Sequence, residues 1–194
     1  MIFDLLAQTI GGDTIKQISR EIGADEKKTE QASSAALPLL LGALTKNSGQ
    51  LSGAESLFNA LEKDHDGSVL DDIGGLLSNP SAGNGSGILK HMLGGRQQRV
   101  ESSLSSSTGL DPAAIGKLLQ ILAPLVMGAL GQARKKQALD PSGLSSMLNG
   151  EMRNVEKQGI PTQGLLSLLD TDNDGDISDD IAKIGGGLLG KLFR

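Results

Sequence analysis

Asp170, Asp172 and Asp174 alternate along one short stretch of the chain, and Gly175 follows them directly. Alternate residues of a loop present their carboxylates to one centre, and a glycine at the sixth position permits a sharp turn. Calcium is a hard cation that takes about six to eight oxygen ligands, so this order of residue types suits it. The pattern predicts a calcium site in residues 170–180, with the ligands Asp170, Asp172, Asp174, Asp176, Asp179 and Asp180.

This spacing resembles that of EF-hand and dockerin-type calcium loops. The resemblance implies that Asp176 binds through its backbone carbonyl. This sequence departs from the pattern at position 12 of the loop, where Ile181 replaces the usual bidentate acid. The loop would then close early and bind calcium weakly, with a dissociation constant of about 10⁻⁴ to 10⁻³ M. The alternative is a solvated turn in which Asp179 and Asp180 cap the next helix.

A second acidic loop, residues 62–72, repeats this pattern earlier in the chain. Its predicted ligands are Glu62, Asp64, Asp66, Ser68, Asp71 and Asp72. The copy is weaker, because Glu62 is longer than aspartate and Lys63 places a positive charge beside the site. We also expect Val69 and Ile177, at matching positions, to form a short antiparallel bridge that joins the two loops.

This sequence contains few of the residue types that catalysis requires. The chain has no cysteine, which excludes thiolate catalysis and cysteine-bound metals, and its only histidines are His65 and His91. We expect both histidines at the surface. A hydrolase would need a pocket that joins one of them to an acid and a serine. The sequence therefore predicts a protein that is not an enzyme.

The composition favours an all-α fold. Aromatic residues make up 2% of the chain, with no Trp and no Tyr, so the core must be aliphatic, as it is between packed helices. The formal net charge of -5 argues against nucleic acid as a partner. Asp4 interrupts the apolar start and no basic segment precedes it, so we expect no secretory signal and a cytoplasmic protein.

Capping residues mark the helices that must position the loops. Asp25, Asp111 and Asp140 each precede a helical stretch, and the last two stand before a proline at the first helical position. The longest apolar tract, residues 118–131, is shorter than the roughly 20 residues of a membrane span. We therefore expect it to be a buried helix.

Two blocks of the sequence occur twice. Residues 23–44 align with 109–130 without gaps, and 61–73 align with 169–181. Pro38 and Pro124 match inside the first pair, where each should kink an apolar helix. The sequence thus predicts two pseudo-equivalent helical halves, each with a kinked apolar helix and an acidic loop.

The predicted organisation is a first repeat at residues 1–78, a flexible linker at 79–87 rich in Gly, Ser and Asn, and a second repeat at 88–194. Two arrangements of the halves are open at this stage. They pack together with their apolar helices face to face, or they form independent units on the linker.

The last residues, 181–194, carry Ile181, Ile184, Leu188 and Leu192 on one face of a helix, with basic residues near the end. We expect a core helix, with a membrane-surface helix as the less favoured alternative.

The stretches Ile22-Gly-Ala-Asp25, Leu37-Pro38-Leu-Leu-Leu-Gly-Ala-Leu44 and Gly190-Lys-Leu-Phe-Arg194 resemble a bacterial domain-of-unknown-function family typified by YidB. The resemblance covers most of the chain and implies an all-helical bacterial protein with no catalytic residues to carry over. Taken together, we expect a non-enzymatic calcium-binding interaction or scaffold protein with a protein partner, self-association included. The alternative is a peripheral membrane or assembly factor that acts through its C-terminal helix.

Overall fold

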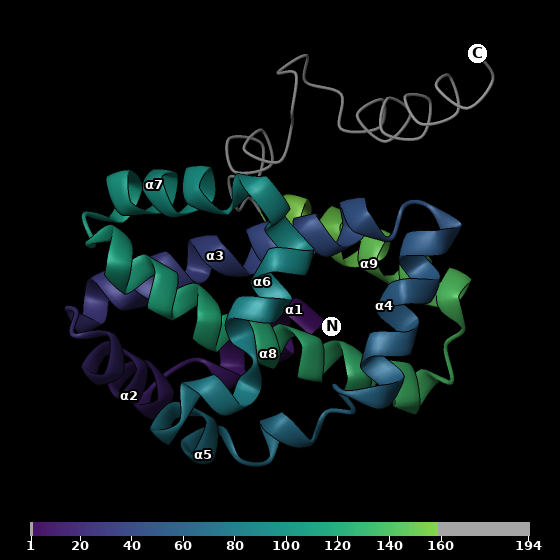
Figure 1. Ribbon diagram of the computed structural model, residues 1–194, viewed down its shortest axis with the longest axis horizontal. Coiled ribbons are helices and arrows are strands. Elements are labelled where there is room, and N and C mark those ends of the chain that lie inside the picture. Colours follow the sequence, from purple (N-terminus) through teal and green to yellow (C-terminus); the bar gives the residue numbers. More distant parts are fainter. Residues whose placement is uncertain (1, 159–194) are drawn as a thin grey trace, which may run out of the picture.

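The protein is helical throughout the part that the computed structural model describes, residues 2–158, with no strand in that range. Figure 1 shows the helices packed around one another in a single body. The α-helices are α1 (Ile2–Thr9), α2 (Asp13–Ile22), α3 (Glu26–Asn47), α4 (Leu51–Lys63), α5 (Ile73–Ser78), α6 (Gly85–Leu93), α7 (Gln97–Thr108), α8 (Pro112–Gln137) and α9 (Pro141–Lys157). Short 3-10 helices are η1 (Ser68–Leu70), η2 (Pro80–Gly83) and η3 (Gly94–Arg96). The predicted all-α class is confirmed.

Helix α8 is the core of the fold. Every residue from Leu118 to Gly131 except Gln120 is buried, because α1, α2, α3, α4, α6 and α7 all pack against this helix. It is long and apolar enough to cross a membrane, but 72% of its most apolar stretch is buried inside the protein. A helix that is apolar on all sides and covered by other helices is a core helix, as the sequence predicts.

The predicted caps are in place at three helix starts. Asp25 accepts a hydrogen bond from the Lys28 amide at 3.0 Å, Asp111 from the Ala113 amide at 2.8 Å and Asp140 from the Gly143 amide at 2.7 Å. Each bond satisfies one of the free amides at a helix N-terminus.

The two aligned blocks that hold Pro38 and Pro124 have the same local geometry where they begin. Gly23 and Gly109 both end a helix in the left-handed conformation, with φ of 70° and 66°. Helices α3 and α8 then run on past their prolines without a break. That the halves share one arrangement as a whole stays a prediction, as does the kink at each proline.

The segment predicted as a flexible linker, residues 79–87, is largely helical. It contains η2 and the start of α6, and Gly85 is buried where α6 crosses α8. A side chain at position 85 would overlap the backbone carbonyl of Gln120, so only glycine allows this crossing. Helices from both predicted halves contribute to one buried cluster, which puts the described residues in a single core.

Candidate functional site: the first acidic loop and the cleft between α4 and α6

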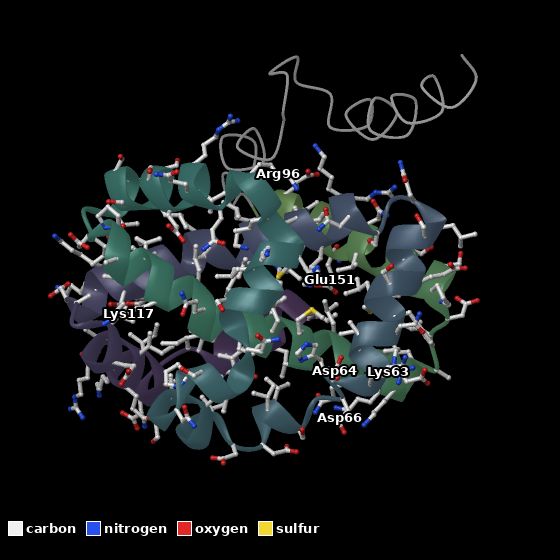
Figure 2. The ribbon with its side chains drawn as sticks, viewed as in Figure 1. Lys63, Asp64, Asp66, Arg96, Lys117 and Glu151 are labelled. Atoms are coloured by element: carbon white, nitrogen blue, oxygen red, sulfur yellow. The ribbon has the colours of Figure 1, made fainter. Side chains whose placement is uncertain are left out.

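The first acidic loop, residues 62–72, runs from the last turn of α4 through η1 to the start of α5. Its sharp turn falls at Gly67, which has a φ of 104° that side chains rarely adopt. Figure 2 shows Asp64 and Asp66 at the lower end of α4, at the surface of the molecule. The turn chemistry that the sequence predicts for this loop is therefore present.

Asp66 is bound to α8. Its Oδ2 atom lies 2.9 Å from Lys135 Nζ, and its Oδ1 atom accepts a hydrogen bond from the Ser68 amide at 3.0 Å. The Lys135 ammonium, assisted by the Ser68 amide, holds the pKa of the Asp66 carboxyl well below its usual range. Both oxygens of this predicted calcium ligand are thus occupied by groups of the protein itself.

Two other predicted ligands also have partners within the protein. Glu62 Oε1 lies 3.6 Å from Arg134 Nη1, and Asp72 Oδ1 accepts a hydrogen bond from the Gly75 amide at 2.8 Å as the cap of α5. Between residues 2 and 158, no three His, Asp or Glu side chains gather in a way that could hold a metal ion. The calcium site predicted at 62–72 stays a prediction, and the described arrangement does not bring its ligands to one centre.

The six predicted ligands of the second loop lie outside the described residues: Asp170, Asp172, Asp174, Asp176, Asp179 and Asp180. The proposed bridge between Val69 and Ile177 falls outside them too, because Ile177 is not described.

Two glycines of α8 allow the first acidic loop to pack closely against this helix. A side chain at Gly128 would overlap Val69, and one at Gly131 would overlap the backbone carbonyl of His65. The loop therefore lies directly against the helix backbone. Gly128 matches Gly42 in the aligned blocks 109–130 and 23–44, and this packing gives one reason for a glycine at position 128.

Arg134 holds the last turns of α4 to α8. Its guanidinium lies 4.7 Å from the centre of the Phe58 ring, in cation–π geometry, and its side chain is only 12% exposed. Together with Lys135, it gives the end of α8 two cations that face the acids of the loop. The negative charge of the loop is partly neutralised within the fold.

A cleft of about 630 Å³ opens beside this loop, between α4 and α6. Each helix contributes residues at helical spacing, so each presents one face to the cleft. Met127 of α8 and Leu44 of α3, both nearly buried, form its base. The lining residues are Leu44, Asn47, Gly53, Ser56, Leu57, Ala60, Asp64, His65, Asn84, Gly87, Ile88, His91, Met92 and Met127.

Both histidines of the chain line this cleft, His65 from the loop and His91 from α6. His91 is exposed, as predicted, whereas His65 is half-buried. Burial lowers the pKa of His65, against the opposing effect of the nearby Asp64 carboxylate. Uncharged imidazole is therefore favoured at neutral pH.

The cleft also contains Ser56 and Asp64, the residue types that a hydrolase would need beside a histidine. The Ser56 hydroxyl, however, donates a hydrogen bond to the Ser52 carbonyl at 2.8 Å. Sequence reasoning missed this cleft, because nothing in the order of residues indicates that residues 53–65 and 84–92 face each other.

Comparison with known proteins identifies a family that this chain matches. The pattern of a bacterial protein family of unknown function, DUF937, matches residues 4–133, which covers α2 to α7 entirely and most of α1 and α8. No curated protein and no solved structure matches the chain. A match over this share of the chain, with the helical fold already described, leads to one conclusion: the chain belongs to the DUF937 family of bacterial proteins of unknown function.

Proposed function

We propose that the protein is a non-enzymatic interaction protein whose cleft between α4 and α6 binds an amphipathic helical segment. The observation that carries this proposal is the shape and lining of the cleft. Two helices wall it, and α8 and α3 supply an apolar base through Met127 and Leu44. Proteins that bind an amphipathic helix use a groove of this kind between their own helices.

The side chains inside the cleft fit an apolar partner with a polar face. Leu57 contributes half-buried apolar surface to the α4 wall, and Ile88 and Met92 line the α6 wall with little of their own surface exposed. Methionine is unbranched and polarisable, so it adapts to partners of different shape. Polar groups such as Asp64 would meet the polar side of a bound helix.

Asn47, a polar residue that lines the cleft, also stabilises the fold. The Asn47 side chain donates hydrogen bonds to the carbonyls of Met92 at 3.0 Å and His91 at 3.2 Å. These carbonyls lie at the end of α6, where no helical amide is left for them. Asn47 therefore fixes the position of α6 relative to α3, and so fixes one wall of the cleft.

Calcium belongs to this proposal through the second acidic loop alone. The spacing of Asp170, Asp172 and Asp174 before Gly175 supports an ion site there. In the first loop, by contrast, the Asp66 carboxylate forms an ion pair with Lys135. We therefore propose one calcium ion per chain, bound at residues 170–180, as a structural or regulatory ion.

A synthetic 14-residue leucine–lysine amphipathic helix tests the cleft. We expect it to shift the methyl NMR signals of Met92 and Met127 in the full chain, because both line the cleft. Ser56→Arg should weaken this binding by filling the cleft and repelling the lysines of the peptide. Ser52→Arg adds the same charge to α4 at an exposed position that does not line the cleft, so binding should persist.

Two results would overturn the proposal. The first is a peptide that leaves the Met92 and Met127 signals unchanged at millimolar concentration. The second is hydrolysis of p-nitrophenyl acetate by the full chain that disappears in Ser56→Ala, which would make the cleft an active site.

A further inference from the structure

We infer that the occupant of the cleft is residues 181–194 of the same chain. This inference rests on the proposed function, since it names the helical segment that the cleft binds. Its consequence is that the protein blocks its own binding surface, and an external partner must displace this segment.

The apolar residues of this segment match the cleft in kind and in spacing. Ile181, Ile184, Leu188 and Leu192 recur at three- and four-residue intervals, which places them on one face of a helix. A helix of this kind needs apolar side chains to cover that face. The cleft offers Leu57, Ile88 and Met127 among its lining residues.

The charges of the two partners are complementary. The only charged side chains in residues 181–194 are Lys183, Lys191 and Arg194. Asp64 lines the cleft, and no Lys or Arg is among the described residues that line it. Opposite charges at the rim of a groove favour one orientation of the bound helix and speed its association.

The chain is long enough to bring the segment to the cleft. Helix α9 ends at Lys157, and residues 159–180 lie between the described part and the segment. An extended chain gains about 3.3 Å per residue, so residues 159–169 alone reach about 36 Å when the loop at 170–180 is folded around calcium, and the whole connection reaches about 70 Å without calcium. A compact domain of this size has a radius of gyration of about 15 Å. Even the shorter reach is therefore comparable to the diameter of the domain.

Tethering also makes weak binding sufficient. A segment tethered to the protein that holds its site has an effective concentration of about 1 mM there. A segment with an intrinsic dissociation constant of about 0.1 mM would thus occupy the cleft about 90% of the time. Modest apolar contacts are enough to keep the cleft filled.

The first test uses methyl NMR of the full chain. Met92 and Met127 line the cleft, whereas Met147 and Met152 lie in α9 and serve as internal references. We expect Leu188→Glu combined with Leu192→Glu to shift the first two signals and leave the references in place. The matched control is Gly186→Glu with Gly190→Glu, which adds the same charge to the opposite face of the segment. This control should leave all four signals unchanged.

The second test measures how tightly the leucine–lysine helix binds to these variants. Removing a competitor that fills the cleft 90% of the time should tighten binding by about tenfold. We expect this gain for the Leu188/Leu192 double variant and no gain for the Gly186/Gly190 double variant. Equal affinity for the wild type and the Leu188/Leu192 variant would overturn the inference while the proposed function stands. A peptide that binds to neither would overturn the proposed function itself.

The third test decides whether the segment acts within its own chain. The chain has no cysteine, so Gly190→Cys accepts a single nitroxide label. We expect the label to broaden the Met92 and Met127 signals of the chain that carries it. Broadening that appears only when labelled chains are mixed with isotope-labelled chains would show a second copy in the cleft and would overturn the inference, as would no broadening at all.

Discussion

Lys135 and Asp66 connect the end of the core helix to the first acidic loop, with 2.9 Å between Nζ and Oδ2. The two residues lie 69 positions apart in the chain. The pair gives the loop a cation from within the protein, at the place where the sequence pattern suggests a metal ion. The first loop thus keeps its geometry through α8, and the second loop is the better candidate for calcium.

The Lys135–Asp66 pair should show a favourable coupling in a double-mutant cycle. Asp66→Asn and Lys135→Met should each lower the stability slightly, and the double variant should lose less than the sum. Urea denaturation at low and high salt measures this coupling, which should weaken with salt because both side chains are half-exposed. Lys136→Met removes the same charge one position further along α8, and it should show no coupling to Asp66.

The Lys135–Asp66 pair also predicts how the stability of the protein changes as the pH falls. The folded-state pKa of Asp66 is depressed, so its contribution is fully present above the unfolded value of about 3.9 and is lost progressively as the pH falls from there through the folded-state pKa. Asp66→Asn should therefore lower stability more at pH 6 than at pH 2.5. An equal effect at both pH values would contradict this assignment.

Gly131→Ala should destabilise the protein although alanine is the better helix former. Its methyl group would overlap the His65 carbonyl, and such overpacking costs about 1–3 kcal/mol. Gly150 in α9 is the matched control, because a methyl group there meets nothing within 4 Å. Gly150→Ala should stabilise the protein by up to about 1 kcal/mol. If both variants gained stability in urea denaturation, the loop would not be seated as described.

Glu151→Ala should loosen the attachment of α1. The buried Glu151 carboxylate accepts a hydrogen bond from the Phe3 amide at 3.1 Å, at the start of α1. Removing it leaves a buried amide without that acceptor, at a cost of about 1–3 kcal/mol in the free energy of unfolding. Glu151→Gln keeps an oxygen acceptor and should lose less. Thermal melts of the two variants would test the order, and equal losses would show that the hydrogen bond is unimportant.

His65 should make the protein less stable under mildly acidic conditions. Burial depresses its folded-state pKa below the ordinary value of 6.5, so the unfolded chain takes up the proton first as the pH falls. Stability should therefore decrease below about pH 6.5 in the wild type, and His65→Gln should remove that part of the decrease. An NMR titration of the imidazole with a midpoint above 6.5 would rule this out.

Calcium should bind once per chain, at the second acidic loop. Calorimetric titration of the full chain should give a weak site with a dissociation constant of about 10⁻⁴ to 10⁻³ M, and little response to magnesium. Asp172→Asn with Asp174→Asn should remove the binding. Asp64→Asn with Asp71→Asn, the comparable change in the first loop, should leave it intact. Binding lost in both variants would instead indicate a site that the two loops share.

The local features of this protein could be predicted from its sequence. Composition and capping residues predicted the all-α class, and Asp25, Asp111 and Asp140 cap helices at the predicted places. The tract at 118–131 is buried, as expected. These predictions succeed because a cap depends on groups only two or three residues away, and because a uniformly apolar helix must be covered.

Only the tertiary structure decided which distant residues meet. The sequence shows the acids of residues 62–72 but not that Lys135 lies beside Asp66, since this pair depends on how α8 passes the loop. The cleft is decided in the same way, because α4 and α6 each pack on α8 and thereby come to face each other across Met127. The sequence determines the chemistry of each side chain, whereas the packing of whole helices determines which other residues that side chain contacts.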